Sequence, residues 1–158
     1  MLEKEGYNVI MSRVTDKTVG LYDRPKMANE TDATLFVSVH FNALFGSTET
    51  GIETFYYKNS SSHPSRLGNK LHNDANRIQK SRSLATEIHN ALISDTKAVN
   101  RGIKRASFVV VRESEVPSAL LELGFMTNPS DLSKMVRNDY QNTLARSVVK
   151  GINNYYNK

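Results

Sequence analysis

Two apolar segments constrain the fold of this chain more than any other feature of its sequence. Residues 34–43 are mostly β-branched or aromatic and are apolar at nearly every position, which is typical of a strand buried on both faces of a sheet. Residues 119–125 have the same character, apart from one charged residue, Glu122. The sequence therefore predicts two buried strands that lie far apart along the chain.

Strand and helix patterns alternate through the rest of the chain: strands are predicted at residues 7–14, 53–58 and 108–111, and helices at residues 21–29, 83–94 and from 128 onward. The last helix carries an apolar stripe spaced by four residues, formed by Tyr140, Leu144, Val148 and Ile152. Residues 59–80 form a polar excursion that ends in a helix. This alternation predicts an α/β sandwich with a largely parallel sheet.

Size and composition limit the classes of protein to consider. The 158 residues suffice for a single domain, 1–158, and no apolar run is long enough to span a bilayer. The absence of cysteine excludes disulfides and thiolate metal sites, so any zinc must be held by histidine and carboxylate. The net charge of +5 favours a polyanionic partner. Nucleic acid is not expected, because no basic cluster is interleaved with stacking aromatic residues.

A histidine lies near the end of the first apolar strand. Strand alternation places Ser38, His40 and Asn42 on one face. His40 is close to the C-terminal end, where open α/β sheets bind their ligands. Taken alone, it is more often a core histidine whose ring nitrogens bond to neighbours.

Glu122 interrupts the second apolar strand, so its carboxylate is expected to be withdrawn from water. A buried carboxylate needs a cation, a metal ion or a raised pKa. An ion pair is as good an explanation as a functional role, and four arginines are candidates for it: Arg13, Arg24, Arg101 and Arg112.

Together, His40 and Glu122 indicate a metal-assisted hydrolase, in which a neutral imidazole binds zinc and a desolvated carboxylate acts as general base. Catalytic zinc usually has three protein ligands, and His40 is the one convincing ligand in this sequence. The other histidines, His63, His72 and His89, match no HxxxH-type pair and are expected to have surface or packing roles.

Three separated sequence strings resemble the zinc-dependent N-acetylmuramoyl-L-alanine amidases (amidase type 3) that act on the bacterial cell wall: Ser38-Val-His40-Phe-Asn42-Ala43, Arg101-Gly102-Ile-Lys104 and Pro117-Ser118-Ala-Leu-Leu-Glu122-Leu-Gly124-Phe125-Met-Thr-Asn128. The similarity runs from about Glu5 to the C-terminus, with the motifs in the family's order. Several motifs in order are far more specific than any one of them.

The resemblance implies a twisted, mostly parallel sheet flanked by helices on both faces. It also implies hydrolysis of the amide between N-acetylmuramic acid and L-alanine in peptidoglycan, with Zn²⁺ as cofactor. His40 then matches a zinc ligand and Glu122 the glutamate that activates water. Ser38 and Asn42 are expected to orient His40, and Arg101 to assist there or to bind substrate. We expect a monomer, open to a regulatory partner, in the cell wall or outside the cell.

The chain departs from the family pattern at its beginning. Two family zinc ligands, a His in a Gly-His-Gly motif and a Glu that opens the first helix, have no counterpart and are expected upstream of Met1. The family's first strand and most of its first helix would then be absent, and residues 2–5 would be the last turn of that helix, capped by Gly6.

Two other functions stay open at this stage. A non-catalytic peptidoglycan-binding module, or a partner-dependent pseudo-amidase, would use the same surface without cutting. A glycosidase would need a second acid facing Glu122, and Glu53, at the head of a neighbouring strand, is the candidate.

Overall fold

A computed structural model describes residues 1–46, 48–58 and 63–157. Its sheet has four strands in the order β1-β4-β2-β3, with bounds β1 Phe36–Asn42, β2 Ile52–Tyr57, β3 Asn100–Ala106 and β4 Ser118–Phe125. The pairs β1–β4 and β2–β3 are parallel, and β2–β4 is antiparallel. The predicted α/β class with a mostly parallel sheet is therefore confirmed, with one antiparallel pairing at its centre.

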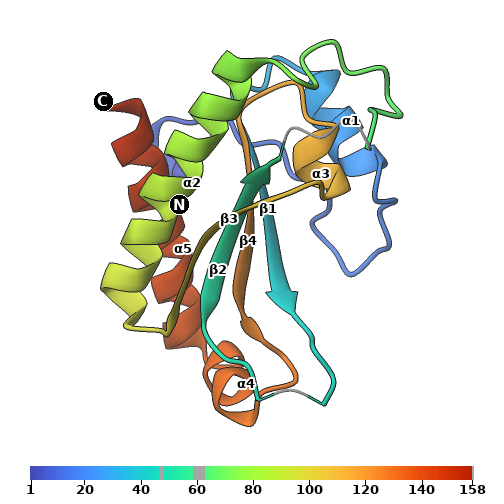
Figure 1. Ribbon diagram of the computed structural model, residues 1–158. Helices are drawn as coiled ribbons and strands as arrows, with labels where there is room; N and C mark the ends of the chain where they lie inside the picture. Colours follow the sequence, from blue (N-terminus) through green and yellow to red (C-terminus); the bar gives the residue numbers. More distant parts are fainter. Residues whose placement is uncertain (47, 59–62, 158) are drawn as a thin grey trace.

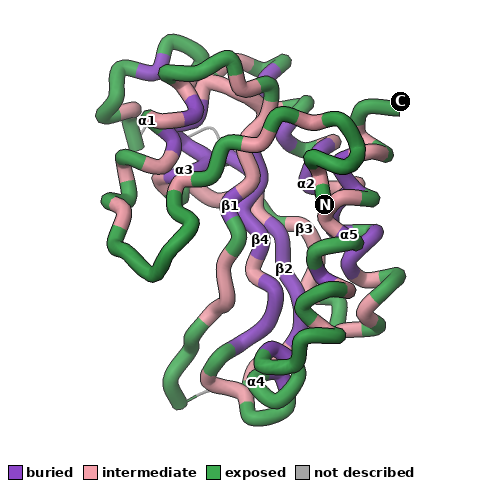
Figure 2. The backbone as a smooth tube through the Cα atoms, turned by 180° about the vertical axis from the view of Figure 1, so that it is seen from behind, coloured by how far each residue is buried: buried purple, intermediate pink, exposed green. Residues whose placement is uncertain are grey.

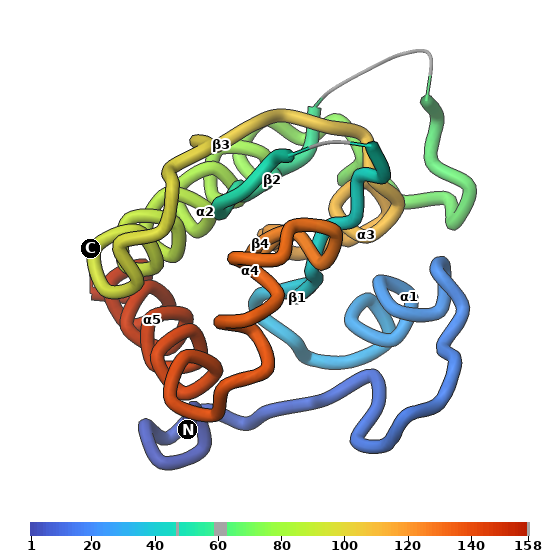
Figure 3. The backbone as a smooth tube through the Cα atoms, turned by 90° about the horizontal axis from the view of Figure 1, so that it is seen from below, coloured from blue at the N-terminus to red at the C-terminus, as the bar shows by residue number. Residues whose placement is uncertain are grey.

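Helices cover both faces of this sheet, so the molecule has three layers (Figures 1 and 3). The long helices α2 (Ala75–Thr96) and α5 (Asn138–Tyr156) pack together against one face. The short helices α1 (Asp23–Asn29) and α3 (Val109–Arg112) lie on the other. Helix α4 (Pro129–Met135) follows β4 at one end of the sheet.

The main core lies between the sheet and the α2–α5 layer. Every second residue of β2 and β4 points into it, including Ile52, Tyr56, Leu121 and Leu123. A smaller core under α3 joins Tyr57 and Leu120 to two valines of that helix. The alternate residues of the same strands, Glu53 and Glu122 among them, therefore belong to the face away from α2 and α5.

Strand β1 is an edge strand and is less buried than the sequence predicts. The strands β4 and β2 are buried over most of their length, whereas Val39 in β1 is 55% exposed (Figure 2). In the described part of the chain, β1 has a strand neighbour on one side only, β4. The prediction that residues 34–43 are buried on both faces is therefore wrong, although the strand itself is confirmed.

Two predicted strands are wrong and one strand was missed. Residues 7–14 form no strand with any described residue, and their apolar side chains Met11 and Val14 are largely exposed. Residues 109–112 form helix α3, because Phe108 O accepts hydrogen bonds from the Val111 and Arg112 amides and the valines pack on the sheet. Strand β3 was missed because an edge strand with a charged sequence lacks the apolar signal of a buried one.

The remaining predicted helices are found with changed bounds: the helix predicted at residues 83–94 begins at residue 75, and the one predicted from residue 128 onward is divided into α4 and α5. Residues Leu2–Glu5 form a short 3-10 helix capped by Gly6 at φ 87°. The side chain of Asn128 caps α4 by accepting hydrogen bonds from the Ser130 and Asp131 amides. Among the described residues, no helix is both long and apolar enough to cross a membrane.

Candidate active site

Three ionisable residues form a row across three neighbouring strands. His40 of β1 is paired in register with Glu122 of β4, and Glu122 is paired with Glu53 of β2. Residues paired in this way project from the same face of a sheet. The fold therefore brings together the two residues that the sequence singled out, and adds a third.

Glu122 lies at the centre of this row and is half-buried. Its Oε2 atom is buried and has no hydrogen-bond partner among the described residues. Burial, and secondarily the negative charge of Glu53, raises the pKa of Glu122 to about 7. A carboxyl with this pKa exchanges a proton near neutral pH, as a general base must.

The alternative explanation of Glu122, an ion pair with arginine, is not met among the described residues. Arg101 pairs with Glu49 and Glu53, and Arg112 pairs with Glu113. Among the described residues, no arginine compensates the Glu122 carboxyl, and its pKa is raised.

His40 lies beside Glu122 with one polar contact from its own strand. The Oγ atom of Ser38 lies 2.7 Å from His40 Nε2, as the expected orienting role of Ser38 requires. Burial lowers the pKa of His40, and the positive charges of Arg24 and Arg13 lower it further. The imidazole is therefore neutral at pH 7, the form that binds metal ions or accepts a proton.

Asn42, which was expected to orient His40 or to bind substrate, has no side-chain hydrogen bond to His40 among the described residues. Its Nδ2 atom donates instead to Glu53 Oε1 at 3.0 Å. The cause is an irregularity in the β1–β4 pairing between His40 and Asn42, which shifts Asn42 into register with Phe125.

Glu53 is the site residue that sequence reasoning missed as part of the hydrolase. It is 5% exposed and accepts from three donors: Asn42, Arg101 Nε at 3.2 Å and Lys104 Nζ at 2.5 Å. Arg101 also contacts Glu49, and its guanidinium lies 5.0 Å from the centre of the Phe125 ring. The Arg101-Gly102-Ile-Lys104 string thus serves to hold a buried carboxylate next to Glu122.

The described residues do not complete a zinc site. No group of three or more His, Cys, Asp or Glu side chains with metal-binding geometry occurs in the part of the chain that the structure describes. His40 is suited to be one ligand, but Glu53 is already engaged by three donors, and catalytic zinc usually needs three protein ligands. Two of the other three histidines contact neighbouring side chains: His89 contacts Thr54 and Asn100, and His72 contacts Tyr57.

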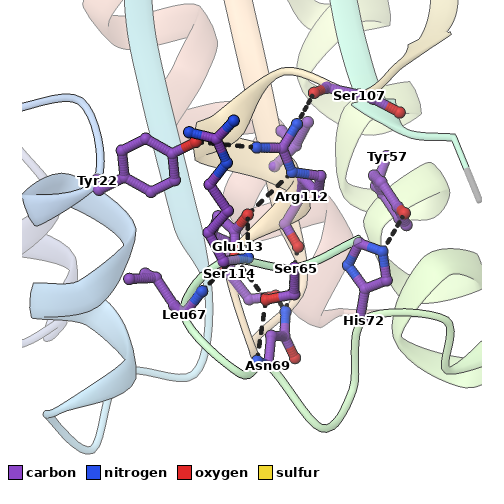
Figure 4. Close-up of polar contacts among 12 residues, drawn as sticks. Tyr22, Tyr57, Ser65, Leu67, Asn69, His72, Ser107, Arg112, Glu113 and Ser114 are labelled. Carbon is purple, nitrogen blue, oxygen red and sulfur yellow. Dashed lines mark hydrogen bonds and ion pairs between the residues drawn. The ribbon is translucent and has the colours of Figure 1, made fainter. Parts of the chain in front are cut away.

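Of the polar excursion predicted at residues 59–80, the described residues 63–80 lie at the opposite end of the sheet from His40, Glu122 and Glu53 (Figure 1). Residues 59–62 are outside the described residues. The described part follows the C-terminal end of β2, whereas Glu53 is near the start of that strand. It is fastened by buried Glu113, which accepts hydrogen bonds from Ser65 Oγ and from the Arg66 and Leu67 amides (Figure 4). This segment therefore has a structural attachment of its own, away from the row of His40, Glu122 and Glu53.

Comparison with known proteins identifies the family. Residues 1–154 match the sequence pattern of the N-acetylmuramoyl-L-alanine amidase family. The chain belongs to this family.

Relatives of the amidase family match nearly the whole chain. It is 34% identical over 157 residues to the uncharacterized protein YqiI of Bacillus subtilis, covering 99% of this chain and 68% of YqiI. It is 32% identical over 155 residues to the N-acetylmuramoyl-L-alanine amidase LytC of the same organism, covering 98% of this chain but 28% of LytC. The chain thus spans about two thirds of one relative and under a third of the other.

Solved amidase structures have the same fold. The N-acetylmuramoyl-L-alanine amidase from Clostridium difficile 630 superposes with a TM-score of 0.81 at 34% identity, over 96% of this chain and 73% of that one. The CwlD amidase from Clostridioides difficile, solved in complex with the GerS lipoprotein, superposes with a TM-score of 0.81 at 25% identity, over 98% of this chain and 78% of that one.

Proposed function

We propose that this chain hydrolyses the amide between N-acetylmuramic acid and L-alanine in peptidoglycan, with Glu122 as the general base. The observation that carries the proposal is the buried, unpaired Oε2 of Glu122, on a carboxyl with a pKa of about 7, in register with a neutral histidine. Membership of the amidase family supports the reaction class.

Glu122 has two tasks in this reaction. Ionised, it accepts a proton from the water that attacks the amide carbonyl, and protonated, it returns that proton to the departing amine of L-alanine. A pKa of about 7 suits both directions of transfer at neutral pH, because neither form is strongly favoured. Ser38, through its contact with His40, fixes the imidazole beside Glu122.

Zinc is the cofactor that the family resemblance predicts, with His40 as one ligand. Because the described residues supply no group of three ligands, no step of the reaction is assigned to the metal here.

The cell wall is the proposed location, because peptidoglycan is the proposed substrate and LytC is by its name an amidase of the same bond. A protein partner is a further proposal, supported by the CwlD amidase, which was solved bound to a lipoprotein. Arg101 stays a proposed substrate contact, since its side chain remains partly exposed beside Glu53.

The test compares amine release from purified peptidoglycan by the unchanged chain, by E122Q and by E30Q, each supplied with excess Zn²⁺. E30Q is the matched control, because it also removes one carboxylate but lies exposed, in an ion pair with Lys26. We expect E122Q to lose at least a hundredfold in rate, about the contribution of a general base, and E30Q to keep full activity. Equal rates of amine release for E122Q and the unchanged chain would refute the role of Glu122. If the unchanged chain bound peptidoglycan but released no amine, the chain would be a pseudo-amidase.

A further inference from the structure

Three apolar side chains are exposed together just beyond the strands that carry His40 and Glu122. Leu44 and Phe45 follow β1, and Met126 follows β4. They are 49%, 89% and 48% exposed, respectively. Single exposed apolar residues are ordinary on a protein surface, but several on two adjoining loops next to a proposed active site indicate a binding surface. We call Leu44, Phe45 and Met126 the apolar lip.

Hydrogen bonds hold the two loops of the apolar lip together. The Leu44 amide donates to Thr127 Oγ1 at 3.1 Å, and Thr127 Oγ1 donates to Leu44 O at 3.3 Å. The Met126 amide donates to Asn42 O at 2.7 Å. Phe45 is therefore presented next to a braced pair of loops.

The apolar lip lies within reach of a substrate bound at Glu122. Phe45 is five residues from His40, which limits their separation along the chain to about 17 Å at the rise of an extended strand. Met126 is four residues from Glu122. A polymer whose amide bond lies at Glu122 extends over this distance.

We propose, resting on the proposed function, that the apolar lip binds the glycan strand of peptidoglycan, with Phe45 stacked on the C–H face of a sugar ring. An aromatic face suits the apolar face of a sugar ring. The apolar lip contains no charged side chain, and the cations Arg101 and Lys104, which come from edge strand β3, are engaged by Glu53. A surface that is aromatic and carries no charge of its own fits the sugar rather than the acidic peptide.

The chain contains no tryptophan, so F45W places a single fluorescent reporter on the apolar lip. We expect its emission to change in a saturable way with a tetramer of N-acetylglucosamine, which has the sugar chemistry but no peptide. The matched control is V136W, which reports from another exposed apolar position, 68% exposed and beyond α4. An unchanged F45W emission, or an equal response from V136W, would refute the proposal. A response only to the sugar-free dipeptide L-alanyl-D-isoglutamine would assign the apolar lip to the peptide and overturn it as well.

Co-sedimentation with insoluble peptidoglycan gives a second readout. We expect F45A to bind about three- to tenfold more weakly, the loss of one aromatic contact, and F45Y and V136A to bind as the unchanged chain does. Amine release without any response of F45W would leave the amidase function standing and refute the apolar lip. A response of F45W in a chain that releases no amine would support the apolar lip and refute the amidase function.

Discussion

At the scale of single residues, the candidate site depends on one carboxyl, Glu122, whose ionised form the fold disfavours. Glu122 has a pKa of about 7 in place of the ordinary 4.5, because burial and the charge of Glu53 disfavour its ionised form. The raised pKa also makes Glu122 a stability element with a definite pH dependence. Between pH 4.5 and about 7 the folded chain holds a proton that the unfolded chain has released, so this contribution is complete at low pH and is lost as the pH rises through about 7.

Replacing Glu122 with glutamine should therefore stabilise the metal-free protein in alkaline solution. We expect E122Q to raise the melting temperature at pH 8.5, where the native carboxyl is ionised, and to change it little at pH 5, where it is protonated. Thermal unfolding in the presence of EDTA at both pH values measures this difference. A melting temperature shift of the same size at both pH values would contradict the assignment.

At the scale of elements, the α2–α5 pair depends on a glycine at the helix contact. A Cβ atom on Gly151 would lie 2.4 Å from Ile88 Cα, so alanine there must push the two helices apart. Alanine improves helix propensity by about 0.5–1 kcal/mol, but overpacking a tight contact costs about 1–3 kcal/mol. The packing cost is larger than the gain in helix propensity. The close approach of the two helix backbones therefore favours glycine at position 151.

The variant G151A should lower the free energy of unfolding by about 1 kcal/mol, the difference between the central values of these two terms. Urea denaturation followed by circular dichroism measures it. N154A is the control on the same helix, since Asn154 is exposed, and should stay within about 0.5 kcal/mol of the unchanged chain. A neutral or stabilising G151A would show that α2 and α5 are not so closely packed.

A second element depends on Glu113, which fastens residues 65–69 to α3 (Figure 4). Four donors engage its carboxylate: Ser65, Arg112 and two backbone amides. They lower its pKa against the opposing effect of burial. Removing the charge would leave Arg112 buried beside a weakened anchor.

We expect E113Q to release this segment first. Trypsin should then cleave after Arg66 or Lys70 several times faster than in the unchanged chain, because cleavage tracks local opening. The control is E115Q, which removes a carboxylate two residues after Glu113. If trypsin cut both variants at the same rate as the unchanged chain, the hydrogen bonds of Glu113 would not be what holds this segment in place.

The same elements show what the sequence can predict. His40 and Glu122 were found because a polar residue within an apolar strand is a local signal. Glu53 was missed because its meaning comes from the antiparallel pairing of β2 with β4, a tertiary contact without a local pattern. Strand β3 was missed because it is a charged edge strand, and α3 was mistaken for a strand because three consecutive valines favour a strand until packing decides otherwise.

At the scale of the whole molecule, the sheet brings two different surfaces close to Glu122. Towards β3 lie Arg101 and Lys104 on Glu53, and towards the ends of β1 and β4 lies the apolar lip. A substrate made of an acidic peptide and a sugar strand matches this division. The fold that carries this row of residues is shared with solved amidases.

Metal content is a property of the whole molecule as well. The described residues offer no group of three ligands, so the dialysed chain should retain far less than one zinc ion per molecule, and EDTA should leave its melting temperature unchanged. Elemental analysis beside thermal unfolding measures both. Stoichiometric zinc that disappears in H40A would contradict this expectation.

The most direct test of the account is the identity of the bond that the chain cuts. Purified peptidoglycan, digested by the unchanged chain and by E122Q with excess Zn²⁺, is analysed by mass spectrometry for free peptides and for new sugar ends. The account predicts peptides that begin with L-alanine, intact glycan strands, and no such peptides from E122Q. New reducing sugar ends would indicate a carboxylate-pair glycosidase built on Glu53 and Glu122, and equal peptide release by E122Q would show that Glu122 is not the base.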